Sequence, residues 1–437
     1  MKYAVVTFGC RVNQADSLGF EEQLLAAGAT ATSTDAADLV VINTCSVTAT
    51  ADQGARQTIR RIARDNPGAR IVVTGCYATR RPDDLASLPN VARVVHNDDK
   101  PRLLPILSAA SASSASAFSA FFAASAPSEG GPCGATIEPG VMGRTAFTLR
   151  VQTGCAEPCS YCIIPSTRGA PRSVPVADVL REIDRVVSVG FKEIALTGVH
   201  LGSYGRDLRP AVSLADLLRA IAAHRSGRLQ PDRGHQSVLF RISSLEPMDC
   251  TSEIVDLVAD CEVFAPHFHL PLQHASDQML SAMRRPYTIG YYADLVDRIR
   301  GRIPGAAIGT DVIVGFPGET DDDVDALAGY LERSPLTHVH VFPYSDRPGT
   351  VASTFGGRPP GAAIRERARR VREIGQRLAQ RFRDAQIGTT HRALTLEDGS
   401  LVVTGNYLKL RIPPGCPRNA WVDVRVVSHD HGELLAG

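Results

Sequence analysis

Residues 151–162 are Val151-Gln152-Thr153-Gly154-Cys155-Ala156-Glu157-Pro158-Cys159-Ser160-Tyr161-Cys162. The stretch places three cysteines at the spacing C-x3-C-x2-C, directly after a run that predicts a strand. A loop this short can wrap three thiolates around one face of a cubane iron–sulfur cluster and leave the fourth iron open. Structural zinc needs a fourth closed ligand, and no further Cys or His lies nearby in the sequence. The spacing favours a catalytic cluster on Cys155, Cys159 and Cys162, with zinc and a distant fourth ligand as the alternative.

The region around this loop, residues 145–360, alternates strand and helix patterns. This alternation predicts a parallel β/α barrel, partial or complete, with helices such as Pro175–Val189 and Asp321–Arg333 between the strands. The expected strands are Thr145–Gln152, Glu193–Thr197, Leu239–Ser243, His267–Leu270, Ala307–Val314 and His338–Phe342. In such a barrel, the carboxyl ends of the strands carry the site.

Residues 1–100 predict a smaller α/β domain around a parallel sheet. Cys10, Cys45 and Cys76 each follow a predicted strand, so all three are expected at the same edge of that sheet, where ligands bind in open α/β folds. The predicted strands are Tyr3–Phe8, Leu39–Asn43, Arg70–Thr74 and Val91–Val95, with helices near Asp16–Ala27 and Thr48–Arg64. We therefore expect a second cluster there; three inert buried thiols beside a single-cluster barrel are the alternative.

The rest of the chain divides into three segments. Residues 101–144 are rich in Ala and Ser and predict a linker. Residues 361–386 predict an amphipathic helix with a basic face, which is either solvated or contacts phosphate through residues such as Arg365, Arg369 and Arg372. Residues 387–437 contain short strand-like runs and predict a small β-barrel.

The composition and the N-terminal residues indicate the cellular compartment, but they do not indicate a binding partner. With 47 basic and 46 acidic residues, the net charge of +1 offers no argument for nucleic-acid binding. No apolar run reaches about 18 residues, which predicts no membrane span. The first residues lack the apolar core and cleavage site of a signal peptide, so we expect a cytoplasmic protein without a disulfide framework. Nothing demands more than a monomer, and Cys133, Cys250, Cys261 and Cys416 are expected to be bystanders.

The cysteine spacing, with Tyr161 before the last cysteine, resembles radical S-adenosylmethionine (SAM) enzymes. Two three-cysteine sets in this order resemble the methylthiotransferases over nearly the whole chain. Among the methylthiotransferases, this chain most resembles the MtaB-type group, which acts on threonylcarbamoyladenosine. The stretches that carry this resemblance are Gly9-Cys10-Arg11-Val12-Asn13-Gln14, Asn43-Thr44-Cys45-Ser46-Val47-Thr48, Gly75-Cys76-Tyr77-Ala78 and Cys162-Ile163-Ile164-Pro165. One departure is His274-Ala275-Ser276, where the family usually has Ser-Gly-Ser. The His274 imidazole either tunes recognition or, as we expect, faces solvent.

This resemblance implies two 4Fe–4S clusters and SAM as cofactors. It implies methylthio transfer to C2 of the threonylcarbamoylated adenosine beside the anticodon of a tRNA, with electrons from a donor such as flavodoxin or ferredoxin. The positions matching SAM contacts are Tyr161, Thr197, Gly198, Ser243, Glu246 and Asp311, although capping or packing is an equal alternative for the last two. The stretch Gly405-Asn406-Tyr407-Leu408-Lys409 resembles the RNA-binding TRAM domain and implies an RNA contact at Lys409. The alternatives are an isopentenyladenosine-directed enzyme and a non-catalytic, zinc-stabilised RNA-binding protein.

Overall fold

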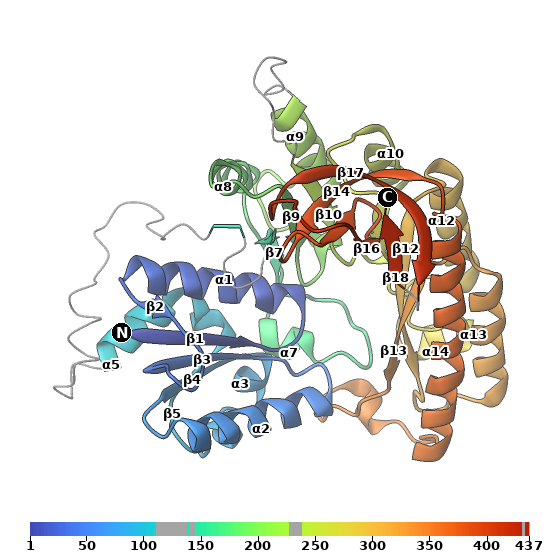
Figure 1. Ribbon diagram of the computed structural model, residues 1–437. Helices are drawn as coiled ribbons and strands as arrows, with labels where there is room; N and C mark the ends of the chain where they lie inside the picture. The colour runs from blue at the N-terminus through green and yellow to red at the C-terminus, as the bar shows by residue number, and fades with distance from the viewer. Residues whose placement is uncertain (111–137, 140–144, 227–237, 431–432, 437) are drawn as a thin grey trace.

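The structure, a computed structural model, describes residues 1–110, 138–139, 145–226, 238–430 and 433–436. An N-terminal parallel-sheet domain, a central β/α barrel and a C-terminal closed β-barrel confirm the predicted fold class (Figure 1). Most of the Ala/Ser tract and Cys133 lie outside the described residues. No helix in the described ranges is long and apolar enough to cross a membrane.

The N-terminal sheet has five parallel strands in the order β2-β1-β3-β4-β5. Its central strand is buried along its whole length because helices cover both faces. The strands are β1 Lys2–Thr7, β2 Thr30–Ala31, β3 Leu39–Thr44, β4 Arg70–Gly75 and β5 Val91–Val95. Helices α1 Arg11–Ala26 and α5 Leu103–Ala110 pack on one face, and α2 Ala49–Asp65, α3 Cys76–Arg80 and α4 Pro82–Ala86 pack on the other. The two-residue β2 is too short to leave a pattern in the sequence, and was missed.

The central region is an open barrel of two three-stranded parallel sheets. An isolated bridge between Phe240 and Phe264 links the first sheet to the segment that leads into the second, and the N-terminal helix α1 packs beside β6. One sheet contains β6 Ala146–Arg150, β9 Glu193–Thr197 and β10 Leu239–Ile242; the other contains β11 His267–His269, β12 Ala307–Val314 and β13 His338–Pro343. The predicted barrel is thus a partial one, with its strands close to the predicted ranges.

Helices cover the outside of this barrel and one of them leads to the C-terminal barrel. They are α8 Val176–Ser188, α9 Leu214–Ser226, α10 Ser252–Asp260, α11 Asp277–Ala282, α12 Ile289–Arg302, α13 Asp321–Arg333 and α14 Gly361–Asp384. The long helix α14 buries Val371, Ile374 and Leu378, as its apolar spacing predicts. The loop that carries Cys155 runs from β7 Gln152–Thr153 through α7 Ile164–Arg168 to β8 Arg172–Ser173.

The C-terminal barrel closes in the order β14-β15-β16-β18-β17. Its strands are β14 Thr390–Leu396, β15 Leu401–Thr404, β16 Lys409–Arg411, β17 Trp421–Asp430 and β18 Glu433–Ala436. The fully buried Arg241 of β10 docks this barrel on the central one. Arg241 Nε lies 3.0 Å from Glu193 Oε1, and Nη1 donates to the carbonyl of Gly405 at 2.8 Å. The same guanidinium lies over the Tyr407 ring, 4.7 Å from its centroid.

We expect Arg241→Met to loosen this docking strongly. The substitution leaves the buried Glu193 carboxylate without its cation, a loss that costs about 3–5 kcal/mol at comparable sites. Hydrogen exchange of residues 401–411 should accelerate. Arg302→Met is the matched control, because Arg302 forms exposed pairs with Asp256 and Asp260. Equal exchange in both variants would show that the buried pair does not hold the barrel.

Candidate active site

The first cysteine set lies at the carboxyl edge of the N-terminal sheet. Cys10 follows β1, Cys45 follows β3 and Cys76 begins α3 directly after β4. These strands are neighbours, so their carboxyl ends bring the three thiols to one cavity, as predicted. The residues before Cys10 and Cys76 must be glycines, because the backbone there has positive φ and other atoms of the chain lie too close for a Cβ. Gly9 has φ +92° and a Cβ there would lie 2.7 Å from Cys45 Sγ, while Gly75 has φ +103° and a Cβ would lie 2.2 Å from the Thr44 carbonyl.

The three thiols of this set have different electrostatic surroundings. Burial, together with the adjacent thiols of Cys10 and Cys76, raises the pKa of Cys45 to about 12. Burial alone would also raise the pKa of Cys76, but the cations of Arg168 and Lys100 lower it below its ordinary value. The Val47 backbone N–H donates to Cys45 Sγ at 3.5 Å, and Asn97 Nδ2 donates to Cys76 Sγ at 3.7 Å. Clustered thiols with N–H donors suit an electropositive metal centre.

The second set is folded tightly around its own loop. Cys162 N–H donates to the Cys159 carbonyl at 3.1 Å, and the Glu157 N–H donates to Cys155 Sγ at 3.4 Å. Burial and the neighbouring thiols of Cys159 and Cys155 raise the pKa of Cys162 to about 12. Arg285, which pairs with Glu246, donates to Cys159 Sγ at 3.3 Å. Glu246 thus acts on this set through Arg285, a role that its place in the sequence does not indicate.

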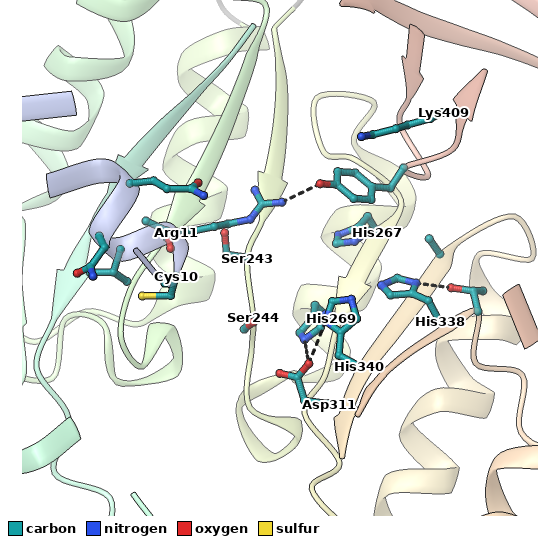
Figure 2. Close-up of a pocket in the computed structure, with 18 of the residues that line it drawn as sticks. Cys10, Arg11, Ser243, Ser244, His267, His269, Asp311, His338, His340 and Lys409 are labelled. Atoms are coloured by element: carbon teal, nitrogen blue, oxygen red, sulfur yellow. Dashed lines mark hydrogen bonds and ion pairs between the residues drawn. The ribbon is translucent and has the colours of Figure 1, made fainter. Parts of the chain in front are cut away.

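One cavity of about 1290 Å³ joins the three folded parts, with the first cysteine set in its wall. Its volume exceeds that of a typical small-ligand pocket and accommodates a cofactor together with a nucleotide. The barrel contributes Thr197, Gly198, Ser243 and Asp311, and the C-terminal barrel contributes Lys409 (Figure 2). Tyr161 and Glu246 do not line it, so the structure brings four of the six predicted SAM contacts to the cavity.

Two family descriptions match this chain. "Uncharacterized protein family UPF0004" matches residues 2–96, and "Radical SAM superfamily" matches residues 149–331. The threonylcarbamoyladenosine tRNA methylthiotransferase MtaB of Aquifex aeolicus is 36% identical over 94% of this chain and 96% of its own length. The Bacillus subtilis MtaB is 33% identical over 86% of this chain and 80% of its own length. The chain belongs to the MtaB family of tRNA methylthiotransferases.

Two further similarities reach beyond the MtaB enzymes. A tRNA-2-methylthio-N(6)-dimethylallyladenosine synthase of Corynebacterium efficiens is 32% identical over 91% of this chain and 75% of its own length. The radical SAM methyltransferase TsrM of Kitasatospora setae shares the fold, with a TM-score of 0.56 at 17% identity over 80% of this chain and 76% of that one. As an MtaB-family enzyme, the chain transfers a methylthio group and uses SAM and two 4Fe–4S clusters.

Zinc at the second set would need a fourth ligand from elsewhere in the chain. His200, distant in sequence, lies beside Cys155 and offers a fourth donor that the local sequence did not reveal. His200 Nε2 lies 2.8 Å from Asp249 Oδ2, a pairing that metal-bound histidines also make. Membership of the MtaB family decides between the two readings in favour of iron–sulfur clusters.

A buried charge network connects the N-terminal domain to the barrel in this MtaB-family chain. Asp16 of α1 lies 2.6 Å from Lys100 Nζ and 3.1 Å from Arg168 Nη2, and it also pairs with Arg150. Arg168 further donates to Asn13 Oδ1 at 2.5 Å. Burial opposes ionisation of Asp16, but the three cations outweigh it and lower its pKa to about 2. Arg168 thus follows the second cysteine set in sequence and contacts the surroundings of the first in space.

The predicted basic face of α14 is largely neutralised. Arg369 lies 2.5 Å from both Glu366 and Glu373, and Arg370 and Arg377 pair with Asp325 and Glu332 of α13. A count of charges within α14 could not include the acidic residues that α13 contributes.

The expectation that His274 faces solvent is wrong. His274 is fully buried, with Nε2 3.3 Å from Glu319 Oε1. Glu319 in turn lies 2.7 Å from Arg367 Nη1 of α14. The imidazole is therefore an internal link between the barrel and α14, away from the cavity lining.

Proposed function

We propose that this chain converts N6-threonylcarbamoyladenosine beside the tRNA anticodon into its 2-methylthio derivative. One observation carries the proposal: Cys10, Cys45 and Cys76 line a cavity that a cofactor and a nucleotide can share, and Ile164 and Arg168 of the helix that follows the second cysteine set line the same cavity. The similarity to MtaB relatives over most of the chain supports this choice of base.

We propose Cys10, Cys45 and Cys76 as ligands of the auxiliary cluster, and Cys155, Cys159 and Cys162 as ligands of the radical SAM cluster. When bound, the clusters and SAM supply the methyl group, the sulfur and the radical that removes hydrogen from C2 of adenine. Arg285 hydrogen-bonds a sulfur of the second set, and Arg168 holds positive charge beside the first. Thr197, Gly198, Ser243 and Asp311 line the space for the cofactor.

The chain's own contribution to RNA binding is proposed at the cavity mouth. Lys409 and Arg411 of β16 line the cavity, where they suit the phosphates of a loop whose base is splayed inward. The exposed Arg365 and Arg372 of α14 are further candidates for phosphate contacts, whereas Arg369 is already engaged by two glutamates. A flavodoxin- or ferredoxin-type donor, a cytoplasmic location and a monomeric state complete the proposal.

The test is an anaerobic assay on tRNAs that carry threonylcarbamoyladenosine, isopentenyladenosine or unmodified adenosine at the target position. Mass spectrometry of the nucleosides should detect the 2-methylthio product with the first tRNA only. The second candidate, an isopentenyladenosine-directed enzyme, is kept because a dimethylallyladenosine synthase is 32% identical. Product from the isopentenyl tRNA alone would replace our proposal by that one, and product from neither would reject both.

A further inference from the structure

One wall of the cavity is lined by imidazoles from neighbouring barrel strands. His267 and His269 lie on β11, Asp311 lies on β12, and His338 and His340 lie on β13 (Figure 2). The parallel register pairs His269 with Gly309 and Asp311 with His340, so these side chains meet on the cavity side of the sheet. The proposed function uses Asp311 only as a lining residue and leaves the histidines without a role.

Three of these side chains converge on one point. His269 Nε2 lies 3.0 Å and His340 Nδ1 lies 3.3 Å from the same oxygen, Asp311 Oδ1. The three ligand atoms all lie within 4.8 Å of one another. Metal–ligand bonds of about 2.0–2.2 Å place neighbouring ligand atoms about 3.0–3.6 Å apart, so the two short separations match the edges of a coordination polyhedron.

Neither contact is a well-aligned hydrogen bond. Asp311 Oδ1 is buried, yet it has no hydrogen-bond partner of acceptable geometry among the described residues. In a hydrogen bond, the ring N–H would point at the oxygen. The two contacts are ion pairs when the imidazoles are protonated. A buried acceptor without a well-aligned donor is costly, and a cation held between the two ring nitrogens and the oxygen would satisfy it.

We propose that His269, Asp311 and His340 bind a divalent metal ion at the cavity wall. Two imidazoles and one carboxylate suit Mn²⁺, Fe²⁺ or Zn²⁺ and leave coordination positions open. Side-chain exposure rises from 12% at His269 through 23% at Asp311 to 58% at His340, so the open positions face the cavity. The neighbouring His338 is held by Thr337 Oγ1, 3.0 Å from its Nδ1, and supports this wall without joining the ligand set.

The open positions take an anionic oxygen of the RNA. Its source is either a backbone phosphate or the carboxylate of the threonylcarbamoyl group, both of which are hard oxygen ligands. This second step rests on the proposed function, whereas metal binding itself does not.

Metal binding is tested directly on the anaerobic, cluster-loaded enzyme by Mn²⁺ titration, following loss of the free-ion EPR signal. Mn²⁺ prefers oxygen and nitrogen over thiolate, so it avoids the cysteines. We expect one Mn²⁺ per chain, with affinity at least about tenfold weaker in Asp311→Asn and His340→Gln. His224→Gln removes a partly exposed His–Asp pair, 2.9 Å from Asp184, and should bind as the parent does. No binding to the parent, or equal binding in all variants, would overturn the site.

A second arm identifies the oxygen. Affinity for an anticodon stem-loop is measured with and without Mn²⁺, using threonylcarbamoylated and unmodified RNA. If Mn²⁺ raises the affinity for the modified RNA alone, the ligand is the carboxylate. If it raises the affinity for both RNAs equally, the ligand is a phosphate. If Mn²⁺ raises the affinity for neither RNA, the metal does not contact RNA. The titration needs no RNA, so its result stands whether or not the assay of methylthio transfer succeeds.

Discussion

Replacing Cys10, Cys45 and Cys76 together by alanine is expected to halve the iron content of the reconstituted enzyme. Two cubane clusters hold about eight irons and one holds about four, so iron and acid-labile sulfide should fall from about eight to about four per chain. Methylthio transfer should fall below detection, because the sulfur donor is lost. Cleavage of SAM should persist, since Cys155, Cys159 and Cys162 remain.

The control for this triple variant removes cysteines that we assign no role. Cys261 and Cys416 are half-buried and lie outside the cavity lining. The double variant Cys261→Ala, Cys416→Ala should keep about eight irons and full transfer. About four irons in both the parent and the triple variant would remove the auxiliary cluster, and the proposed source of sulfur with it. Loss of SAM cleavage in the triple variant would instead indicate that the two parts do not load independently.

Topology explains why the sequence revealed the first cysteine set. Cys10, Cys45 and Cys76 are far apart in the chain, but each follows a strand of the same parallel sheet. Parallel strands point their carboxyl ends to one edge, so strand assignment alone brings the thiols together. The second set needed no topology, because the eight consecutive positions 155–162, shortly after β7, contain all three cysteines.

The roles of single polar residues could not be obtained in this way. His274 was expected in solvent because its partner, Glu319, lies beyond two helices and a strand, and only the folded barrel brings them within 3.3 Å. Glu246 was placed as a SAM contact by its match to the family, and that role stays a prediction; the partner that the structure gives it, Arg285, comes from a later loop. The ion pairs of α14 could not be predicted from the sequence for the same reason, because Asp325 and Glu332 belong to α13.

We expect Asp16→Asn to destabilise the contact between the N-terminal domain and the barrel by about 2–4 kcal/mol. The amide leaves Lys100 and Arg168 buried without their shared anion. Hydrogen exchange of residues 11–26 and 164–168 measures the loss locally, which avoids a two-state assumption for a multidomain chain. Cluster loading on Cys76 should weaken too, because Arg168 loses the carboxylate that holds it beside this thiol.

The pH dependence separates this charge effect from a packing defect. The folded pKa of Asp16 is lowered to about 2 from an ordinary 3.8, so its contribution is present above about pH 4 and lost as the pH falls toward 2. The difference between parent and variant should therefore be constant from about pH 8 to pH 5 and shrink as the pH falls toward 2, whereas the cost of a packing defect would persist there. Asp178→Asn, which breaks an exposed pair with Arg181, should cost less than about 1 kcal/mol. If both substitutions cost the same, the buried network is not what joins the two domains, and the approach of Arg168 to the first cysteine set must depend on backbone packing alone.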